Sequence, residues 1–290
     1  MSHNGQSSMN KLGGFIKLMR PINCAMMGFA VFVGAILATN QPFQDSWLNV
    51  LYGFFTGFLL CAAAMAINDY YDRKIDAVNE PMRPIPSGLI GANAALAFVS
   101  LLTVVGLVFA YFSSVLCLFV AVASWIITVS YVTVGKRSGL PGNFLVSACV
   151  AIPFIYGSIA VTNTVQLNVL LFALMAFLSN TGREITKGIV DTKGDSTQGI
   201  KTLAVRYGDK KAAVASAIFY ISAVALTPIP LFLGLVSVWF IPFVLVTDVG
   251  LVVCSVVLLK NYSRENARKI KKLVLLWFVF GLLAYIFGAL

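Results

Sequence analysis

The sequence NDYYDRKID, residues 68–76, follows directly on residues 54–67, a run as apolar as lipid. Three acids and two bases fall within these nine residues. Ionisable side chains at the edge of hydrocarbon are costly, so by default they mark a functional site. If the preceding helix continues, Asn68, Asp72 and Asp76 lie four residues apart on one helical face.

The side chains on this face predict a site for a hard cation. All three offer oxygen ligands, and neither His nor Cys is nearby, which suits Mg²⁺ better than zinc or copper. Eight residues of helix span about 12 Å, too far for one ion, so two ions bridging a diphosphate fit better. The alternative is a solvated acidic loop, which is disfavoured because Asn68 and Asp69 abut the apolar run without a spacer.

A second charged stretch follows the apolar run 169–178. Its members are spaced three, four and four residues apart: Glu184, Lys187, Asp191 and Asp195. Helical spacing would stack them on one face, although Gly188 and Gly194 argue against an unbroken helix. Two Asp-x-x-x-Asp pairs thus emerge from two separate apolar segments, and together they predict one shared site.

The composition is that of a polytopic membrane protein. Hydrophobic residues make up 59% of the chain and charged residues only 11%, outside the usual soluble range. Apolar runs of about twenty residues recur along the chain. We predict nine membrane spans, near residues 20–39, 48–67, 91–110, 113–134, 143–161, 165–182, 212–234, 239–259 and 270–289. The expected fold is all-α: a single domain, 1–290, of nine transmembrane helices bundled around a central cavity.

The basic residues predict the orientation of these spans. All 21 Lys and Arg residues lie in the N-terminal tail, in 68–90, 135–142, 183–211 and 260–272, or at the membrane edges of these segments. This pattern places the N-terminus and the site on the cytoplasmic side of a cell membrane. It also accounts for the net charge of +10 without nucleic acid as a partner. Residues 1–12 are predicted to be a disordered tail, and 260–272 a solvated loop.

The cysteines and the histidine carry no predicted chemistry. The five cysteines lie inside apolar runs without metal-ligand spacing, and are predicted to be packing residues with no disulfide. His3, the only histidine, lies in the polar tail. Gly157, in the fifth span, is small enough to permit close helix packing.

Further candidates flank the two charged stretches. Arg20 and Asn23 open the first span; Arg20 alternatively anchors the helix at the membrane interface, and Asn23 is as readily explained by helix packing. Arg83 lies in a segment with three prolines in six residues, which excludes helix and predicts a stiff loop. Lys136 and Arg137 end the fourth span, either as a topology signal or as diphosphate contacts. The surplus of basic residues around Asp191 suits a site that holds both metal and phosphate.

These motifs resemble those of the UbiA superfamily of intramembrane prenyltransferases. Asn68-Asp69-x-x-Asp72-x-x-x-Asp76 resembles that family's first motif, and Asp191-x-x-x-Asp195 its second. Tyr131 with Lys136-Arg137 is similar to its loop motif between spans four and five. Within the superfamily, the chain is most similar to the archaeal digeranylgeranylglyceryl phosphate synthases in the segments 20–23, 83–88 and 182–187. Gly188 departs from that pattern, in which an acid often follows the lysine.

The resemblance implies Mg²⁺-dependent transfer of a geranylgeranyl group from its diphosphate to the hydroxyl of geranylgeranylglyceryl phosphate, a lipid-phosphate acceptor. Two Mg²⁺ ions would be held by Asn68, Asp72, Asp76, Asp191 and Asp195. Substrates would be bound by Arg20, Asn23, Arg73, Arg83, Tyr131, Lys136 and Arg137, and the acceptor's phosphate by Arg183 and Lys187. Asp69 and Glu184 are the candidate bases.

Two other functions remain open at this stage. One is an aromatic prenyltransferase that makes a quinone, haem or chlorophyll precursor, which the basic surplus around the second motif disfavours. The other is a cation transporter, because intramembrane acids also suit an ion pathway. Against it, the acids gather at one membrane face, and only Asp248 lies deeper. Membrane lipid is an expected partner, and the sequence predicts no oligomeric state.

Overall fold

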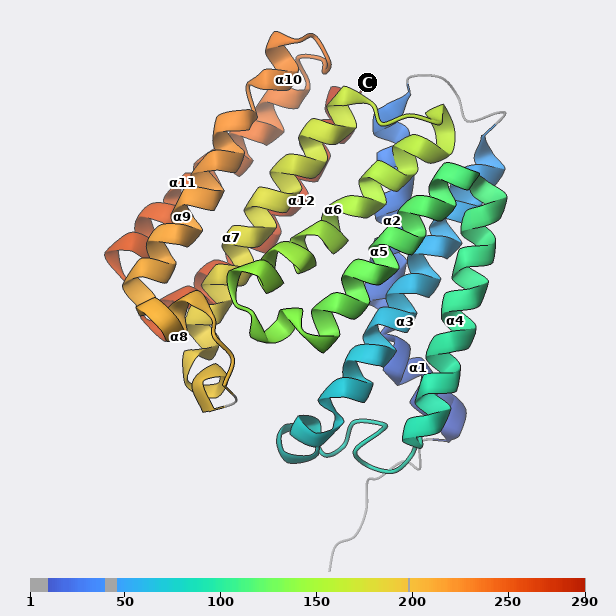
Figure 1. The fold of residues 1–290 in the computed structure, drawn as a ribbon. Coiled ribbons are helices and arrows are strands. Elements are labelled where there is room, and N and C mark those ends of the chain that lie inside the picture. The colour runs from blue at the N-terminus through green and yellow to red at the C-terminus, as the bar shows by residue number, and fades with distance from the viewer. Residues whose placement is uncertain (1–9, 40–45, 198, 290) are drawn as a thin grey trace, which may run out of the picture.

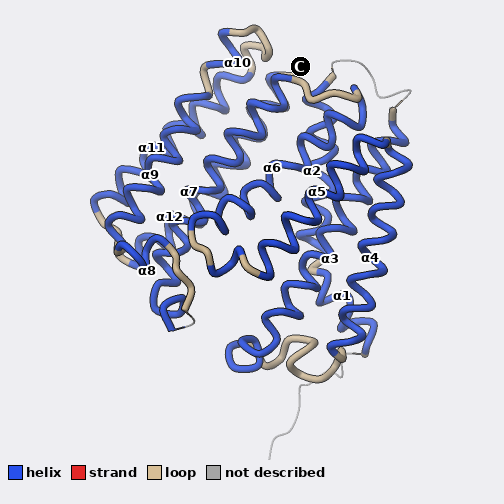
Figure 2. Tube along the Cα trace, in the orientation of Figure 1, coloured by secondary structure: helices blue, strands red, loops and turns tan. Residues whose placement is uncertain are grey.

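The computed structural model describes residues 10–39, 46–197 and 199–289, and every regular element in these ranges is a helix (Figures 1 and 2). In chain order the elements are α1 (Lys11–Met19), α2 (Pro21–Ala38), α3 (Trp47–Asn79), α4 (Ala92–Ser113), α5 (Val115–Thr133), the 3₁₀ turn η2 (Gly135–Arg137), α6 (Leu140–Thr162), α7 (Leu167–Thr197), α8 (Leu203–Tyr207), α9 (Asp209–Leu226), α10 (Ile229–Phe232), α11 (Phe240–Lys260) and α12 (Arg264–Gly288). The fold class predicted from composition, an all-α membrane protein, is confirmed.

Eight helices of the described ranges are long and apolar enough to cross a membrane: α2, α3, α4, α5, α6, the segment from α9 to α10, α11 and α12. The remaining predicted span, 165–182, corresponds to the first half of α7. That helix passes without a break from its apolar part, 167–178, into the polar residues 179–197, which lowers its mean hydropathy. The count of nine spans and the side of the N-terminus therefore stay predictions.

The helices form two groups joined by α6. α3 packs against α2 and α4, whereas α7 packs against α9 and α12, and α6 packs against both α2 and α7 (Figure 1). The contact between α2 and α6 is a backbone approach at glycine. A Cβ atom on Gly157 would lie 2.0 Å from the carbonyl oxygen of Val31, and one on Gly34 would lie 2.1 Å from that of Phe154. The close packing expected at Gly157 is confirmed.

Both helices that carry the charged stretches continue past their apolar parts. α3 runs unbroken through 68–76, as the spacing of its polar residues predicted. α7 also runs unbroken to Thr197, so the expected break at Gly188 and Gly194 was wrong. The cost of a helical glycine is about 1 kcal/mol. Burial of Ile185 and Ile189 on the same helix outweighs it.

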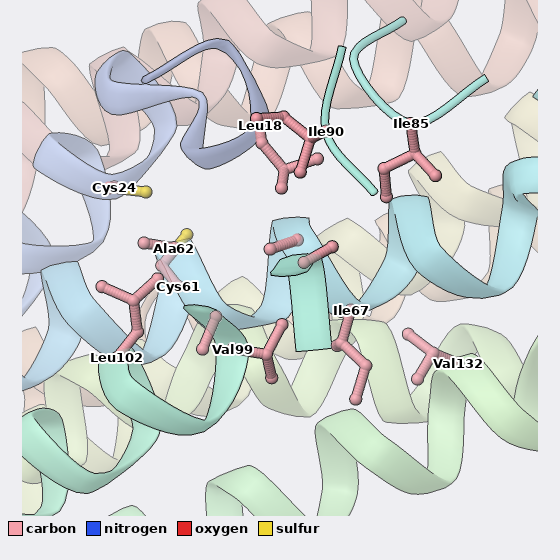
Figure 3. Close-up of a cluster of buried hydrophobic side chains, with 13 residues drawn as sticks. Leu18, Cys24, Cys61, Ala62, Ile67, Ile85, Ile90, Val99, Leu102 and Val132 are labelled. Carbon is pink, nitrogen blue, oxygen red and sulfur yellow. The ribbon is translucent and has the colours of Figure 1, made fainter. Parts of the chain in front are cut away.

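α1 lies over the end of α3 that carries the first motif. Asn10 caps α1 by accepting a hydrogen bond from the Gly13 amide (2.8 Å), so the tail predicted over 1–12 is helical at residues 11 and 12, while 1–9 lie outside the described residues. Figure 3 shows Leu18 of α1 beside Ile90, with Ile85 close by; all three are buried. This cluster holds α1 and the 80–91 loop against α3.

The turn between α5 and α6 lies between the ends of α3 and α7 (Figure 1, lower end). Gly139 has φ 76°, and a Cβ there would lie 2.2 Å from the Lys201 carbonyl oxygen. The Lys201 amide donates to the carbonyl oxygen of Arg137 at 3.3 Å. The segment that follows α7 is thereby held against η2, and the two motif helices share a neighbour.

The predicted loop 260–272 is also corrected. Most of it forms the first turns of α12, which begins at Arg264 after a Ser263 cap. Its charges suggested a loop, but they lie on a helix whose other face is apolar: Ala267, Ile270 and Val274 are buried.

The orientation can be tested by labelling two introduced cysteines. Ser196, exposed at the end of α7, and Val165, exposed before its start, lie at opposite ends of that helix. Ser196→Cys should react with an impermeant maleimide only from the cytoplasmic side, and Val165→Cys only from the outside. The five native cysteines are buried or half-buried, and the unmodified chain is the control. The opposite pattern would reverse the topology.

Candidate active site

The first charged stretch is organised around Asp69, which is 3% exposed. Its Oδ1 is 2.6 Å from Nη2 of Arg20 and 3.4 Å from Nη1 of Arg83. Nη1 of Arg83 also lies 2.7 Å from Oδ2 of Asp76. Partial burial opposes the charge of Arg83, but the two carboxylates offset this and raise its pKa. The network joins the α1–α2 junction, α3 and the proline-rich loop.

Arg20 reaches Asp69 from a sharp junction between helices. Arg20 has φ 53°, the left-handed conformation that ends α1, and Pro21 then begins α2. A non-glycine residue at positive φ is uncommon and costs of order 1 kcal/mol or more. The ion pair with a buried carboxylate stabilises this conformation.

Asp72 is held by a different cation. Nδ2 of Asn68 donates to its Oδ2 at 3.1 Å, and Nζ of Lys136, on η2, forms an ion pair with the same oxygen. All three acids of the first stretch are therefore paired with cations. These cations come from three different segments: the α1–α2 junction, the loop after α3, and η2.

In the part of the chain that the structure describes, four residues predicted to bind substrate form no ion pair with the acids of the first stretch: Asn23, Arg73, Tyr131 and Arg137. Arg73 bends back on its own helix, donating to the Tyr70 carbonyl (2.6 Å) with its guanidinium 4.2 Å from the Tyr70 ring centre. Asn23 and Arg137 are exposed. Tyr131, near the end of α5, lies within range of the charges of Lys187, Glu184 and Asp72. Charged residues of both motif helices thus act on Tyr131, whereas Arg73 is not part of the ion-pair network.

On α7, a carboxylate is shared by two cations. Nη1 of Arg183 lies 2.9 Å from Oε1 of Glu184, and Nζ of Lys187 lies 3.2 Å from its Oε2. Nε of Arg183 is buried and has no hydrogen-bond partner among the described residues. This cluster therefore has a donor available for a further anion.

Asp191 and Asp195 continue the same stripe of α7. Neither carboxylate forms an ion pair or hydrogen bond with another described residue. Partial burial and the neighbouring Asp191 charge raise the pKa of Asp195 to about 6, and the charges of Lys187 and Lys136 oppose this. Lys136 thus pairs with Asp72 on α3 and also acts on Asp195 on α7.

The oxygen donors of the two stripes suit Mg²⁺ chemically, as the sequence predicted. Two carboxylates that repel each other without a bonded cation, Asp191 and Asp195, are an arrangement that a divalent ion stabilises. Within the described ranges, no three acidic, His or Cys side chains stand close enough together to form a metal site by themselves. In this structure Asp72 forms an ion pair with Lys136, and Asp76 forms one with Arg83.

One charged side chain near this site was missed by the sequence reasoning. The charges of Asp191, Lys187 and Arg183 all act on Lys271, near the start of α12. The signal that could have found it is the helical spacing of Ala267, Ile270 and Val274, which places 267–274 on a packed helix.

Comparison with known proteins covers nearly the whole chain. The UbiA prenyltransferase family profile matches residues 27–285. A curated digeranylgeranylglyceryl phosphate synthase of Archaeoglobus fulgidus is 37% identical over 290 residues, 97% of this chain and 98% of that protein. The synthase of the same name from Methanocaldococcus jannaschii is 33% identical over 97% of this chain and 98% of its own.

Solved structures give the same picture. A structure reported for digeranylgeranylglyceryl phosphate synthase in membranes matches with a TM-score of 0.86 and 32% identity, over 96% of this chain and 98% of that one. A UbiA homologue from Archaeoglobus fulgidus bound to GPP and Mg²⁺ matches with a TM-score of 0.67 at 16% identity, over 94% of this chain and 99% of that one. The second match shows a shared fold.

Proposed function

This chain belongs to the UbiA prenyltransferase family, and from that premise we propose that it transfers a geranylgeranyl group from geranylgeranyl diphosphate to the hydroxyl of geranylgeranylglyceryl phosphate. The names of its archaeal relatives support this reaction over an aromatic acceptor and over cation transport. The product would be a precursor of archaeal ether lipids.

The observation that carries the proposal is the position of Lys136 between two carboxylate stripes. It pairs with Asp72 on α3, and its charge acts on Asp195 on α7. Acids from both helices and a fixed cation therefore belong to one site, as binding of a metal and a diphosphate together requires.

The metal would be held by five oxygen-bearing side chains of the two motifs: Asn68, Asp72, Asp76, Asp191 and Asp195. Bound Mg²⁺, for which we propose two ions, would neutralise the diphosphate as a leaving group. Lys136 and Arg83 would move from their carboxylates toward the diphosphate oxygens, adding fixed positive charge. The remaining predicted substrate contacts, Arg20, Asn23, Arg73, Tyr131 and Arg137, stay proposals.

In the transfer, the bond between the allylic carbon and the diphosphate oxygen breaks, and a bond from that carbon to the acceptor's hydroxyl oxygen forms. The hydroxyl proton would pass to an oxygen of the departing diphosphate, which carries the negative charge to accept it. Asp69 and Glu184 were the predicted bases, but each is bonded to two cations. A carboxylate held between two cations orients both of their side chains. We therefore propose that Asp69 positions Arg20 and Arg83, and that Glu184 positions Arg183 and Lys187.

The chain as a whole is proposed to act as one domain in the cell membrane with this site at the cytoplasmic face. The segments rich in Lys and Arg and the motifs lie at the same ends of the helices, which supports this orientation.

Metal dependence is the first expected result. Activity of the purified protein on the two substrates should be lost in EDTA and restored by Mg²⁺ or Mn²⁺, because the proposed ligands are all oxygen atoms. Diphosphate release and product mass are the measurements. Zn²⁺ alone should restore little activity. Full activity in the presence of chelator would contradict the proposed metal site.

Arg183→Ala and Lys187→Ala should weaken binding of the acceptor rather than binding of the prenyl diphosphate. If these side chains bind the acceptor's phosphate, KM for geranylgeranylglyceryl phosphate should rise about tenfold or more while KM for the diphosphate stays unchanged. An acceptor without phosphate should be used no worse by these variants than by the native chain. Equal losses with both acceptors would assign the two residues to the diphosphate and favour the aromatic alternative.

A further inference from the structure

We propose that Lys271 is a third cation of the acceptor-phosphate site, completing from α12 the pair that Arg183 and Lys187 form on α7. This assignment rests on the proposed function, and it brings the last helix of the chain into acceptor recognition. It differs from the sequence-based expectation, in which 260–272 was a solvated loop without a role.

The first step is the register of the two helices. Nε of Arg264 donates to the carbonyl oxygen of Val190 at 2.9 Å, whereas the rings of Tyr285 and Phe172 lie 4.6 Å apart at the other end. From one contact to the other, the residue number rises from 264 to 285 on α12 and falls from 190 to 172 on α7, so the two helices are antiparallel. Seven residues, about 10 Å of helix, separate Arg264 from Lys271. The same step along α7 leads from Val190 to Arg183, so Lys271 and Arg183 lie at one level.

The second step is the face on which Lys271 lies. Ala267 precedes it by four residues and Val274 follows it by three, and both are buried in the core that α12 shares with α7. Residues at these spacings are neighbours on a helix surface. Lys271 is itself half-buried, whereas the next residue, Lys272, is exposed. Lys271 therefore borders the α7 interface, and Lys272 faces away from it.

The third step is the charge around Lys271. Arg183, Lys187 and Arg268 act on it as repelling cations, and Asp191 is the acid that acts on it. Among the described residues Lys271 has no hydrogen-bond or ion-pair partner; its neighbours act by charge alone. Glu184 is already shared by Arg183 and Lys187. Bringing a partly buried ammonium toward two other cations is unfavourable unless an anion lies between them.

The fourth step identifies the class of anion. Nε of Arg183 is a buried donor without a partner among the described residues, and the ammonium groups of Lys187 and Lys271 can each donate to several oxygens. Phosphate has three or more acceptor oxygens and more than one negative charge, which suits three neighbouring cations better than a carboxylate does. The cations lie beside Asp191, so the bound phosphate would be that of the molecule reacting with the donor.

The test uses the full-length purified chain with Mg²⁺ and both substrates. Lys271→Ala should raise KM for geranylgeranylglyceryl phosphate about tenfold, with KM for geranylgeranyl diphosphate and the Mg²⁺ requirement unchanged. Lys271→Arg should restore most of the loss, and the dephosphorylated acceptor, geranylgeranylglycerol, should be used equally by Lys271→Ala and the native chain. Lys272→Ala, which removes the same charge from the exposed face, is the matched control and should match the native chain.

Thermal unfolding of each variant separates binding from folding, and Lys271→Ala is expected to unfold at the native temperature. An unchanged acceptor KM in Lys271→Ala, or a loss equal to that of Lys272→Ala, would overturn the role of Lys271 while leaving the proposed function standing. A rise in the diphosphate KM or in the Mg²⁺ requirement would assign Lys271 to Asp191 and the metal instead. A native chain that does not convert the phosphorylated acceptor would overturn the proposed function itself.

Discussion

Asp191→Asn should lower kcat by about 100- to 1000-fold, the usual result of removing one electrostatic stabiliser from a water-poor site. The substitution keeps the size of the side chain and removes its charge. Asp191 has no bonded partner among the described residues, so folding loses no ion pair. Its effect should therefore be seen in rate and in the Mg²⁺ requirement, with little change in thermal stability.

Asp72→Asn should cause a rate loss of the same order, with one difference. Asp72 pairs with Lys136, so its loss also frees a cation beside the proposed diphosphate site. Tighter diphosphate binding should accompany the slower turnover. Glu265→Gln is the control, since that acid is 80% exposed on the first turn of α12. If Asp191→Asn keeps the native kcat at all Mg²⁺ concentrations, the second motif does not contribute to the metal site.

Gly157→Ala should be the most destabilising small substitution that we predict for this chain. The new Cβ would lie 2.0 Å from the Val31 carbonyl oxygen and 2.6 Å from the Ala35 amide nitrogen. Overpacking costs about 1 to 3 kcal/mol when side chains yield, and the upper end applies here because the obstacle is backbone. Thermal unfolding in detergent is the measurement.

Gly91→Ala is the matched control for this substitution. It adds the same methyl group at the start of α4, where nothing lies within 4 Å of the new atom, and should leave stability unchanged or slightly raised. Equal melting temperatures for the two variants would contradict the close approach of α2 and α6.

The helices that cross the membrane were predictable because the bilayer imposes long apolar runs. The helical phase of Asn68, Asp72 and Asp76 was predictable for the same reason, since α3 continues from such a run. α1 was not: nine residues with two glycines carry too little periodicity, and the helix is held by contacts such as Leu18 with Ile90.

The partners of the motif residues were beyond sequence reasoning. Asp69 and Arg20 are 49 residues apart, and Asp72 and Lys136 are 64 apart. No spacing rule connects such positions, so acids predicted as free ligands or bases were found in ion pairs. Lys271 was missed because composition alone does not distinguish a charged loop from the charged first turns of a helix.

The antiparallel pairing of α7 and α12 has a consequence for biosynthesis. α12 leaves the ribosome well after α7; it covers Ile189 and Val190 on α7, and Arg264 donates a hydrogen bond to the Val190 carbonyl oxygen. A nascent chain that ends before Ser263 has both acidic motifs in place, but the apolar face of α7 still lacks α12 as a neighbour. Chains truncated there should insert and then be degraded, so that synthesis of α12, rather than insertion of the motifs, determines when the enzyme matures.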